Sequence, residues 1–218
     1  MATVTLKGET PLVMHADNIE WADQMEDWKN DPANKAVSKA GEDRTPPWRW
    51  IGCLNYDDPM SGVVTIPTDY IMSCVMSAAA QVPTGKGKGS FKALSQSGIV
   101  CPDFHWPLLV GGKTIAMRDI QALIKLKTFR EHMNAVKDLG FTLLVKRARV
   151  GKAKHVRVRP RFDNWSTVGT MVILNEQITE RVLGQIFEIA GRLKGLGDWR
   201  PGAPSSPGPW GTFTAKIE

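Results

Sequence analysis

The order of the last three segments most constrains how this 218-residue chain can fold. The stretch 175–193 has helical periodicity, and its apolar residues form one stripe: Ile178, Val182, Ile186 and Ile189. A glycine-rich loop, GLGDWRP at 195–201, follows this helix and precedes a final strand, GTFTAKIE at 211–218. Dinucleotide-binding fingerprints need a strand, then glycines, then a helix, so this loop is not one of them. A helix, a loop and a strand in this order indicate the end of a small α/β domain.

The remaining patterns predict an α+β fold in which helices cover one face of a sheet. Alternation, apolar runs and turn residues indicate strands near residue 4 and over 48–58, 63–67, 141–151, 154–165 and 165–175. Helical spacing indicates helices over 18–31, 68–82 and 127–140. The most economical arrangement is a ferredoxin-like (RRM/RAMP-like) βαββαβ core with inserted loops and a basic β-hairpin. We expect one domain over 1–218, with insertions at about 16–60 and 83–125.

Composition indicates a globular protein that works in a reducing compartment. The chain is 42% hydrophobic and contains eight tryptophans, whereas no run of about 18 apolar residues is present to span a membrane. The N-terminal residues lack the apolar core of a signal peptide, so we expect a cytoplasmic protein with no membrane partner. The three cysteines lack metal-binding spacing and predict free thiols: Cys53, Cys74 and Cys101. We expect neither a metal nor another cofactor.

Charge is distributed unevenly along the chain. The net charge is +6, yet acidic residues gather in the first sixty positions and are absent between Asp138 and Asp163. Eight cations occupy that acid-free stretch, together with His155: Lys146, Arg147, Arg149, Lys152, Lys154, Arg157, Arg159 and Arg161. The last three alternate along a strand and predict a ladder about 7 Å apart that follows a phosphate backbone. The alternative is an ordinary solvated strand face.

Two loops carry further candidate contacts to nucleic acid. TGKGKGSFK at 84–92 lacks a Walker pattern, so it is either a mobile phosphate-contacting loop or a plain linker, with Lys86, Lys88 and Lys92 as its candidates. We call the segment 194–210, between the last predicted helix and the final strand, the closing loop. In it, Trp199 can stack on a base and Arg200 can contact a phosphate. The alternative is that this loop ends the helix and Trp199 packs into the core.

Signals for catalysis are sparse. The four histidines are scattered, and His15 is notable only because Asp17 follows it closely. No HExxH motif, GxSxG motif or metal-spaced carboxylate pair is present. We therefore expect a protein that is not an enzyme.

Two segments resemble the RAMP superfamily, the RNA-binding proteins of CRISPR effector complexes, including phage-encoded relatives. VVTIPTDYIMSCVMSAAA is similar to that family's strand, Ile-Pro and helix, and the stretch 190–218 resembles its glycine-rich loop and final strand. The resemblance implies a ferredoxin-like palm whose copies stack along a guide or single strand. The basic arm 146–161 would then face the nucleic acid.

The hypothesis favoured by these observations is a non-enzymatic protein that binds single-stranded nucleic acid, with RNA preferred, and oligomerises along the strand with copies of itself and other effector subunits. A phage-encoded single-stranded DNA-binding protein, or a subunit mimic that interferes with a CRISPR complex, is the first alternative. The second is a metal-independent guide-processing endoribonuclease that uses His15 or His155. The sequence leaves the choice between RNA and DNA open.

Overall fold

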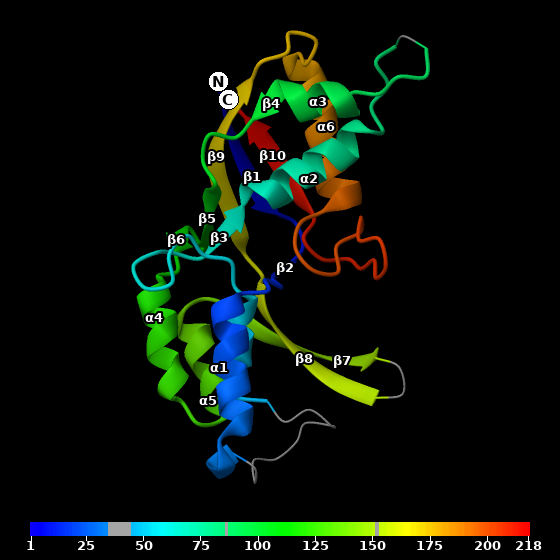
Figure 1. Ribbon diagram of the computed structural model, residues 1–218. Coiled ribbons are helices and arrows are strands. Elements are labelled where there is room, and N and C mark those ends of the chain that lie inside the picture. The colour runs from blue at the N-terminus through cyan, green and yellow to red at the C-terminus, as the bar shows by residue number, and fades with distance from the viewer. Residues whose placement is uncertain (35–44, 86, 151–152) are drawn as a thin grey trace.

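The computed structural model describes residues 1–34, 45–85, 87–150 and 153–218; side chains at 148–155 lie outside the description. The chain forms a large antiparallel sheet and a small one, arranged one above the other (Figure 1). The strands are β1 Ala2–Gly8, β2 Leu12–Val13, β3 Thr65–Pro67, β4 Ile99–Val100, β5 His105–Val110, β6 Lys113–Thr114, β7 Thr142–Val150, β8 Ala153–Phe162, β9 Trp165–Ile173 and β10 Phe213–Ile217. The helices are α1 Ile19–Asn30, α2 Thr68–Ala79, α3 Lys92–Gly98, α4 Met117–Gln121, α5 Phe129–Asp138 and α6 Glu180–Ile189. Short 3-10 turns occupy Pro32–Asn34, Arg49–Cys53 (η2) and Ala122–Lys125, and a π turn spans Ala190–Lys194.

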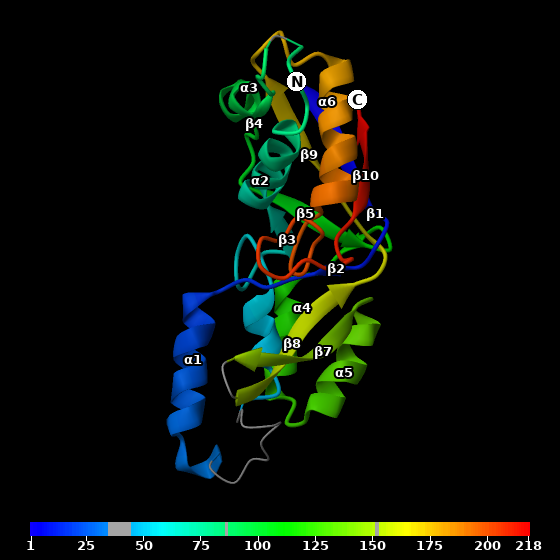
Figure 2. The same cartoon turned by 90° about the vertical axis from the view of Figure 1, so that its right-hand side faces the viewer.

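The large sheet is covered on one face by helices. Its strands follow the order β10-β1-β9-β5-β3, with β4 beside β9 and β6 beside β5, and every pair is antiparallel. Helices α2, α3 and α6 lie together on the same face (Figures 1 and 2). Alternation in β1 explains this one-sided burial, because Val4 and Leu6 are buried whereas Thr3 and Lys7 are exposed. The helices bury the apolar face and leave the other face to solvent.

The small sheet has the order β2-β8-β7 and packs against α5 and the 3-10 turn η2, outside which α1 lies (Figure 2). Its core is aromatic: the rings of Trp50 and Phe141 are 5.7 Å apart, and those of Phe141 and Phe162 are 5.0 Å apart. The indole of Trp50 donates a hydrogen bond to Nδ1 of His132, at 3.2 Å. These residues join one continuous buried cluster with the core of the large sheet.

Several sequence expectations are confirmed and one is wrong. The fold is mixed, with helices and antiparallel sheets, and strands β7 and β8 pair from Thr142↔Arg161 to Val150↔Ala153 as the predicted hairpin. The clearest predicted helix is present as α6. The strand predicted over 48–58 is instead the 3-10 turn η2, in which Trp50 and Cys53 both point inward. Helices α3 and α4 were not expected, and β5, within the span 83–125, pairs with β9 in the large sheet.

In the part of the chain that the structure describes, no helix is both long and apolar enough to cross a membrane.

Candidate functional site

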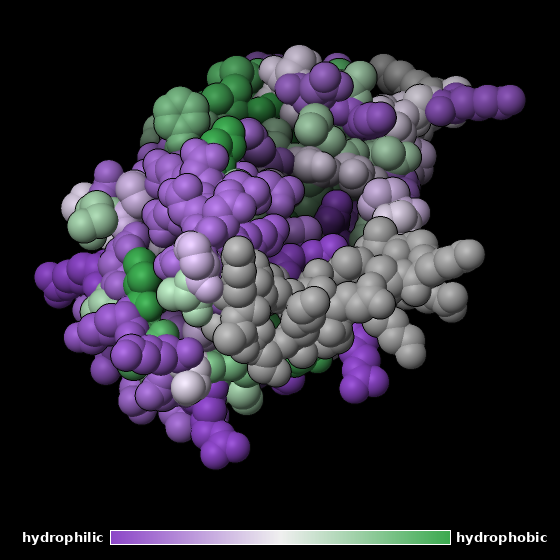
Figure 3. All heavy atoms as spheres, turned by 60° about the horizontal axis from the view of Figure 1, so that its bottom comes forward, coloured by the Kyte–Doolittle hydropathy of each residue, from purple (hydrophilic) through white to green (hydrophobic). Residues whose placement is uncertain are grey.

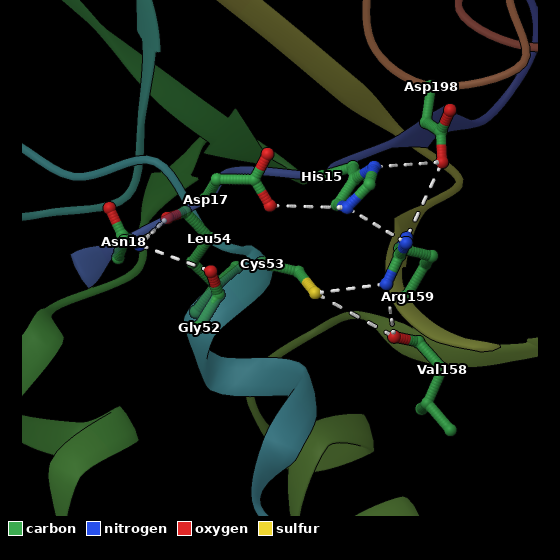
Figure 4. A network of polar contacts seen from close by, with 9 residues as sticks. All are labelled: His15, Asp17, Asn18, Gly52, Cys53, Leu54, Val158, Arg159 and Asp198. Atoms are coloured by element: carbon green, nitrogen blue, oxygen red, sulfur yellow. Dashed lines mark hydrogen bonds and ion pairs between the residues drawn. The ribbon is translucent and has the colours of Figure 1, made fainter. Parts of the chain in front are cut away.

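A polar network centred on one arginine of the predicted ladder joins strand β8 to the turn η2 and the closing loop (Figure 4). The side chain of Arg159, on β8, is only 6% exposed, and its Nε lies 3.4 Å from Oδ2 of Asp198 in the closing loop. Its Nη1 donates to Sγ of Cys53 at 3.3 Å, and its Nη2 lies 2.9 Å from Nε2 of His15. The expectation that Arg159 faces solvent is therefore wrong. Its acidic partner, Asp198, lies 39 positions later in the chain.

The histidine of this network is held in a defined state. Because Arg159 donates to Nε2 of His15, the imidazole proton belongs on Nδ1, which lies 3.7 Å from Oδ2 of Asp198. Burial lowers the pKa of His15 from 6.5; the charge of Arg159 lowers it further, while Asp198 and Asp17 act in the opposite direction. His15 is thus neutral near pH 7, with its lone pair already engaged.

The backbone of the closing loop is hydrogen-bonded to β2. The N–H of Asp198 donates to the carbonyl of Val13 at 2.7 Å, and the N–H of Leu196 donates to the carbonyl of Gly211 at 2.9 Å. Gly197, with φ +78°, lies so close to this strand that a Cβ would be 2.4 Å from the Val13 oxygen. These N–H groups are used internally, so the loop presents side chains rather than a backbone cradle to a ligand.

Two cation–π contacts join the hairpin to the closing loop. Nζ of Lys146, on β7, lies 4.1 Å from the ring centroid of Trp199, and Cζ of Arg161, on β8, lies 5.3 Å from that of Trp210. Arg161 also pairs with Asp163, its Nε being 2.8 Å from Oδ1. The predicted basic arm and the predicted closing loop therefore form one surface, although about fifty residues separate Lys146 from Trp199.

A cavity of about 390 Å³ opens between α2 and the closing loop. Its lining combines apolar residues with the cationic side chains of Lys194 and Arg200, and His15 forms part of its wall. Burial raises the pKa of Cys74, also in the lining, to about 12, while the charges of Arg200 and Lys194 act to lower it. Those charges are therefore close to the cavity floor. No ion pair of Lys194 is present within the described residues.

The other candidate nucleic-acid contacts differ in exposure and in their place in the fold. Arg147 is exposed beside Lys146, and Arg157 is half-buried on β8. Lys88 is exposed, and Lys92 begins α3, which lies at the opposite end of the molecule from the hairpin (Figure 1). Arg149, Lys154 and His155 hold paired strand positions whose side chains lie outside the description, as do Lys86 and Lys152 entirely. The structure thus brings the hairpin and the closing loop together but not the lysine loop.

Two members of the site were missed or undervalued by sequence reasoning. Asp198 was read only as part of a glycine-rich motif, although an acid beside Trp199 and Arg200 was the available signal. Cys53 gave no signal, because its contact with Arg159 bridges 106 positions. Among the described residues, no group of three His, Cys, Asp or Glu side chains could hold a metal ion.

Hydrophilic side chains predominate on the face seen from the small-sheet end of the molecule (Figure 3). Apolar side chains are scattered on this face, which favours a polar partner over an apolar one. Comparison with known proteins identified no matching family model and no matching curated protein.

Proposed function

We propose that this protein binds single-stranded nucleic acid across the surface formed by the hairpin β7–β8 and the closing loop. The observation that carries the proposal is the stacking of Lys146 on Trp199, which places a cation row and an aromatic-bearing loop side by side. Phosphate-neutralising cations beside aromatic rings are the two components that single-strand binding needs. Affinity then depends on salt and only weakly on sequence.

The charges on this surface support an anionic polymer as the partner. Lys146 is exposed on the face of β7 that meets Trp199, while Lys194 and Arg200 line the adjoining cavity. The carboxylate of Asp198 is engaged by Arg159 and so neutralises little of this charge. A surface with several such cations and few competing acids attracts a phosphate backbone.

The order of the strands supports the ferredoxin-like interpretation on which the resemblance to RAMP proteins depends. In a βαββαβ core, the four strands lie in the order 4-1-3-2 and are all antiparallel. Taking β1, β5, β9 and β10 as those strands, with α2 and α6 as the helices, the observed order β10-β1-β9-β5 follows this pattern. On this reading the hairpin β7–β8, with α4 and α5, is an insertion between the second and third core strands, whereas β2 follows the first core strand. Copies of the chain then assemble along the bound strand.

The test measures binding to labelled RNA and DNA of about 30 nucleotides at several salt concentrations, with mass photometry to follow assembly. Replacing Lys146 by alanine should weaken binding and reduce the slope of log K against log salt by about 1, for one lost phosphate contact. The matched control replaces Lys137, an exposed cation of α5, by alanine. Equal loss in both variants, or none in either, contradicts the assigned surface. If neither polymer binds, the basic surface faces a protein partner, as in the interference hypothesis.

Metal-independent cleavage of RNA is the second candidate, because His15, Tyr70 and Lys194 line the same cavity. The hydrogen bond from Arg159 to Nε2 of His15 opposes it, since a general base needs that lone pair free. Incubating hairpin RNA with the protein in the presence of a metal chelator decides between cleavage and binding alone. Cleavage that disappears in His15→Gln supports the enzyme, whereas intact RNA that stays bound supports the binding protein.

A further inference from the structure

We infer that a second cavity, on the other side of His15, binds a phosphate group through Arg157. This cavity of about 310 Å³ lies between the start of α1, the turn η2 and strand β8. His15 lines both cavities, and Arg159, which holds its Nε2, lines the second one. Arg49, Arg157 and Arg159 all contribute to the wall of the second cavity.

The two arginines of β8, Arg157 and Arg159, differ in what they can offer a ligand. The guanidinium of Arg159 is engaged by Asp198, Cys53 and His15. Arg157 is half-buried, and within the described residues it has neither an ion pair nor a hydrogen bond through its guanidinium. A guanidinium partly removed from water without an anion is unfavourable, and phosphate is the anion whose geometry its fork fits. Arg157 is therefore the side chain from which the ligand contact is expected.

The acidic groups around the cavity leave this site available to an anion. Asp17 is the carboxylate in its lining, and its side chain is 96% exposed, so water screens much of its charge. Asp198, from the closing loop, faces Arg159 rather than Arg157. Arg157 thus faces the cavity with no carboxylate paired to it among the described residues.

The ligand is a phosphate carried by a nucleotide-sized molecule. The cavity volume is at the lower end for small-molecule sites, and the side chains of Trp21 and Met25 supply an apolar wall beside the arginines. A phosphodiester of a bound strand and the phosphate of a free mononucleotide offer the same chemistry. The strand source rests on the proposed function, whereas the phosphate site itself does not.

Histidine NMR provides a direct readout, because an anion beside Arg157 adds negative charge near His15 and raises a pKa that burial, and then the charges of Arg159 and Arg157, hold below 6.5. The groups facing His15 are Asp17 on its own segment, Arg157 and Arg159 on β8, and Asp198 in the closing loop. Inorganic phosphate, adenosine monophosphate and a 10-nucleotide RNA are each titrated into the protein. The resonance is assigned with His15→Gln.

With inorganic phosphate we expect the pKa of His15 to rise in the wild type and to stay unchanged in Arg157→Gln. Arg157→Lys, which keeps the charge but not the fork, should bind phosphate about tenfold more weakly than the wild type. Arg181→Gln, an exposed arginine of α6, is the matched control and should behave as the wild type. Far-ultraviolet circular dichroism and thermal unfolding verify that each variant is folded.

The outcomes separate this inference from the proposed function. No effect of any of the three titrants on His15, or equal effects in Arg157→Gln and the wild type, overturns the phosphate site. If RNA still binds in that case and Lys146 is needed, the proposed function stands without the phosphate site. An effect of phosphate and mononucleotide but none of RNA supports the site and assigns it to a free nucleotide.

Discussion

The guanidinium of Arg159 is buried against the carboxylate of Asp198, which is 22% exposed, and this pair fastens the closing loop to the small sheet. Replacing Asp198 by asparagine leaves the arginine charge buried without a carboxylate. We expect the free energy of unfolding, measured in urea, to fall by about 3 kcal/mol. The control is Asp163→Asn, which removes the more exposed partner of Arg161 and should cost less than about 1 kcal/mol. Equal losses in the two variants would show that the buried pair does not stabilise the fold.

The same pair changes the design of variants that test binding. Substituting Arg157, Arg159 and Arg161 together removes Arg159 from the interior as well as two cations nearer the surface. We expect this triple variant to lose stability as well as binding, whereas Lys146→Ala keeps the melting temperature within about 2 °C, as is usual for surface changes. Calorimetry of both variants verifies this. A stable triple variant with normal binding contradicts both the burial of Arg159 and the assigned arm.

Stability is expected to fall as the pH is lowered from 7 to 5. Burial lowers the pKa of His132 from 6.5, and its Nδ1 accepts a hydrogen bond from Trp50, which protonation would abolish. His15 has a lowered pKa for a related reason. Below about pH 6.5 these histidines bind protons in the unfolded chain but not yet in the folded one, because their folded-state pKa values are lower. The stabilisation from the neutral histidines is therefore complete above about pH 6.5 and is lost as the pH falls through the folded-state pKa values. Urea titrations at pH 7.5, 6 and 5 measure this, and a constant free energy of unfolding would rule out both lowered pKa values.

Two glycines near α6 should respond oppositely to alanine. A Cβ on Gly184 meets nothing within 4 Å, so Gly184→Ala should stabilise the helix by roughly 0.5–1 kcal/mol. At Gly191, a Cβ would overlap the carbonyl oxygen of Phe213, which is backbone and cannot rotate away. Gly191→Ala should therefore lower the melting temperature while Gly184→Ala raises it. A Gly191→Ala variant that melts no lower than the wild type would mean that the π turn and β10 are not so closely packed.

The thiols should react slowly in the folded protein. Burial raises the pKa of Cys74 to about 12 and that of Cys101 to about 11, and burial also raises the pKa of Cys53. Because the thiolate is the reactive form, iodoacetamide at pH 8 should label these residues much faster in urea than in buffer. In buffer Cys101 should react first, since it is half-buried and the other two are buried. Mass spectrometry of timed samples identifies the order, and early labelling of Cys74 would contradict its position.

Local patterns predicted the elements that local spacing determines. Helix α6 followed from an apolar stripe of period 3.6, and the hairpin followed from two alternating strands around a glycine. The strand predicted around Trp50 was wrong, because the alternation of Trp48 and Trp50 resembles that of a strand. In the structure, a hydrogen bond to His132, 82 positions away, helps hold Trp50 in a 3-10 turn. That contact cannot be read from eleven residues of sequence.

The candidate site shows the same limit more sharply. The cations of the arm were visible in the sequence because they are consecutive, and so was the tryptophan of the closing loop. Arg159 faces the interior rather than solvent because it pairs with Asp198, which lies 39 positions away along the chain. The stacking of Lys146 on Trp199 depends likewise on the register with which the loop crosses β2. Sequence spacing carries no information on either relation.

Strand β1 lies between β9 and β10, and the N–H of Thr3 donates to the carbonyl of Glu218 at 2.8 Å. During translation, β1 leaves the ribosome long before either neighbour. The small sheet, whose strands end at Phe162, can form while the neighbours of β1 are still unmade. Closing the large sheet is then a late event with high contact order, and folding is expected to be slow at this step. Until then β1 exposes both edges, so nascent chains are at risk of pairing with one another through this strand.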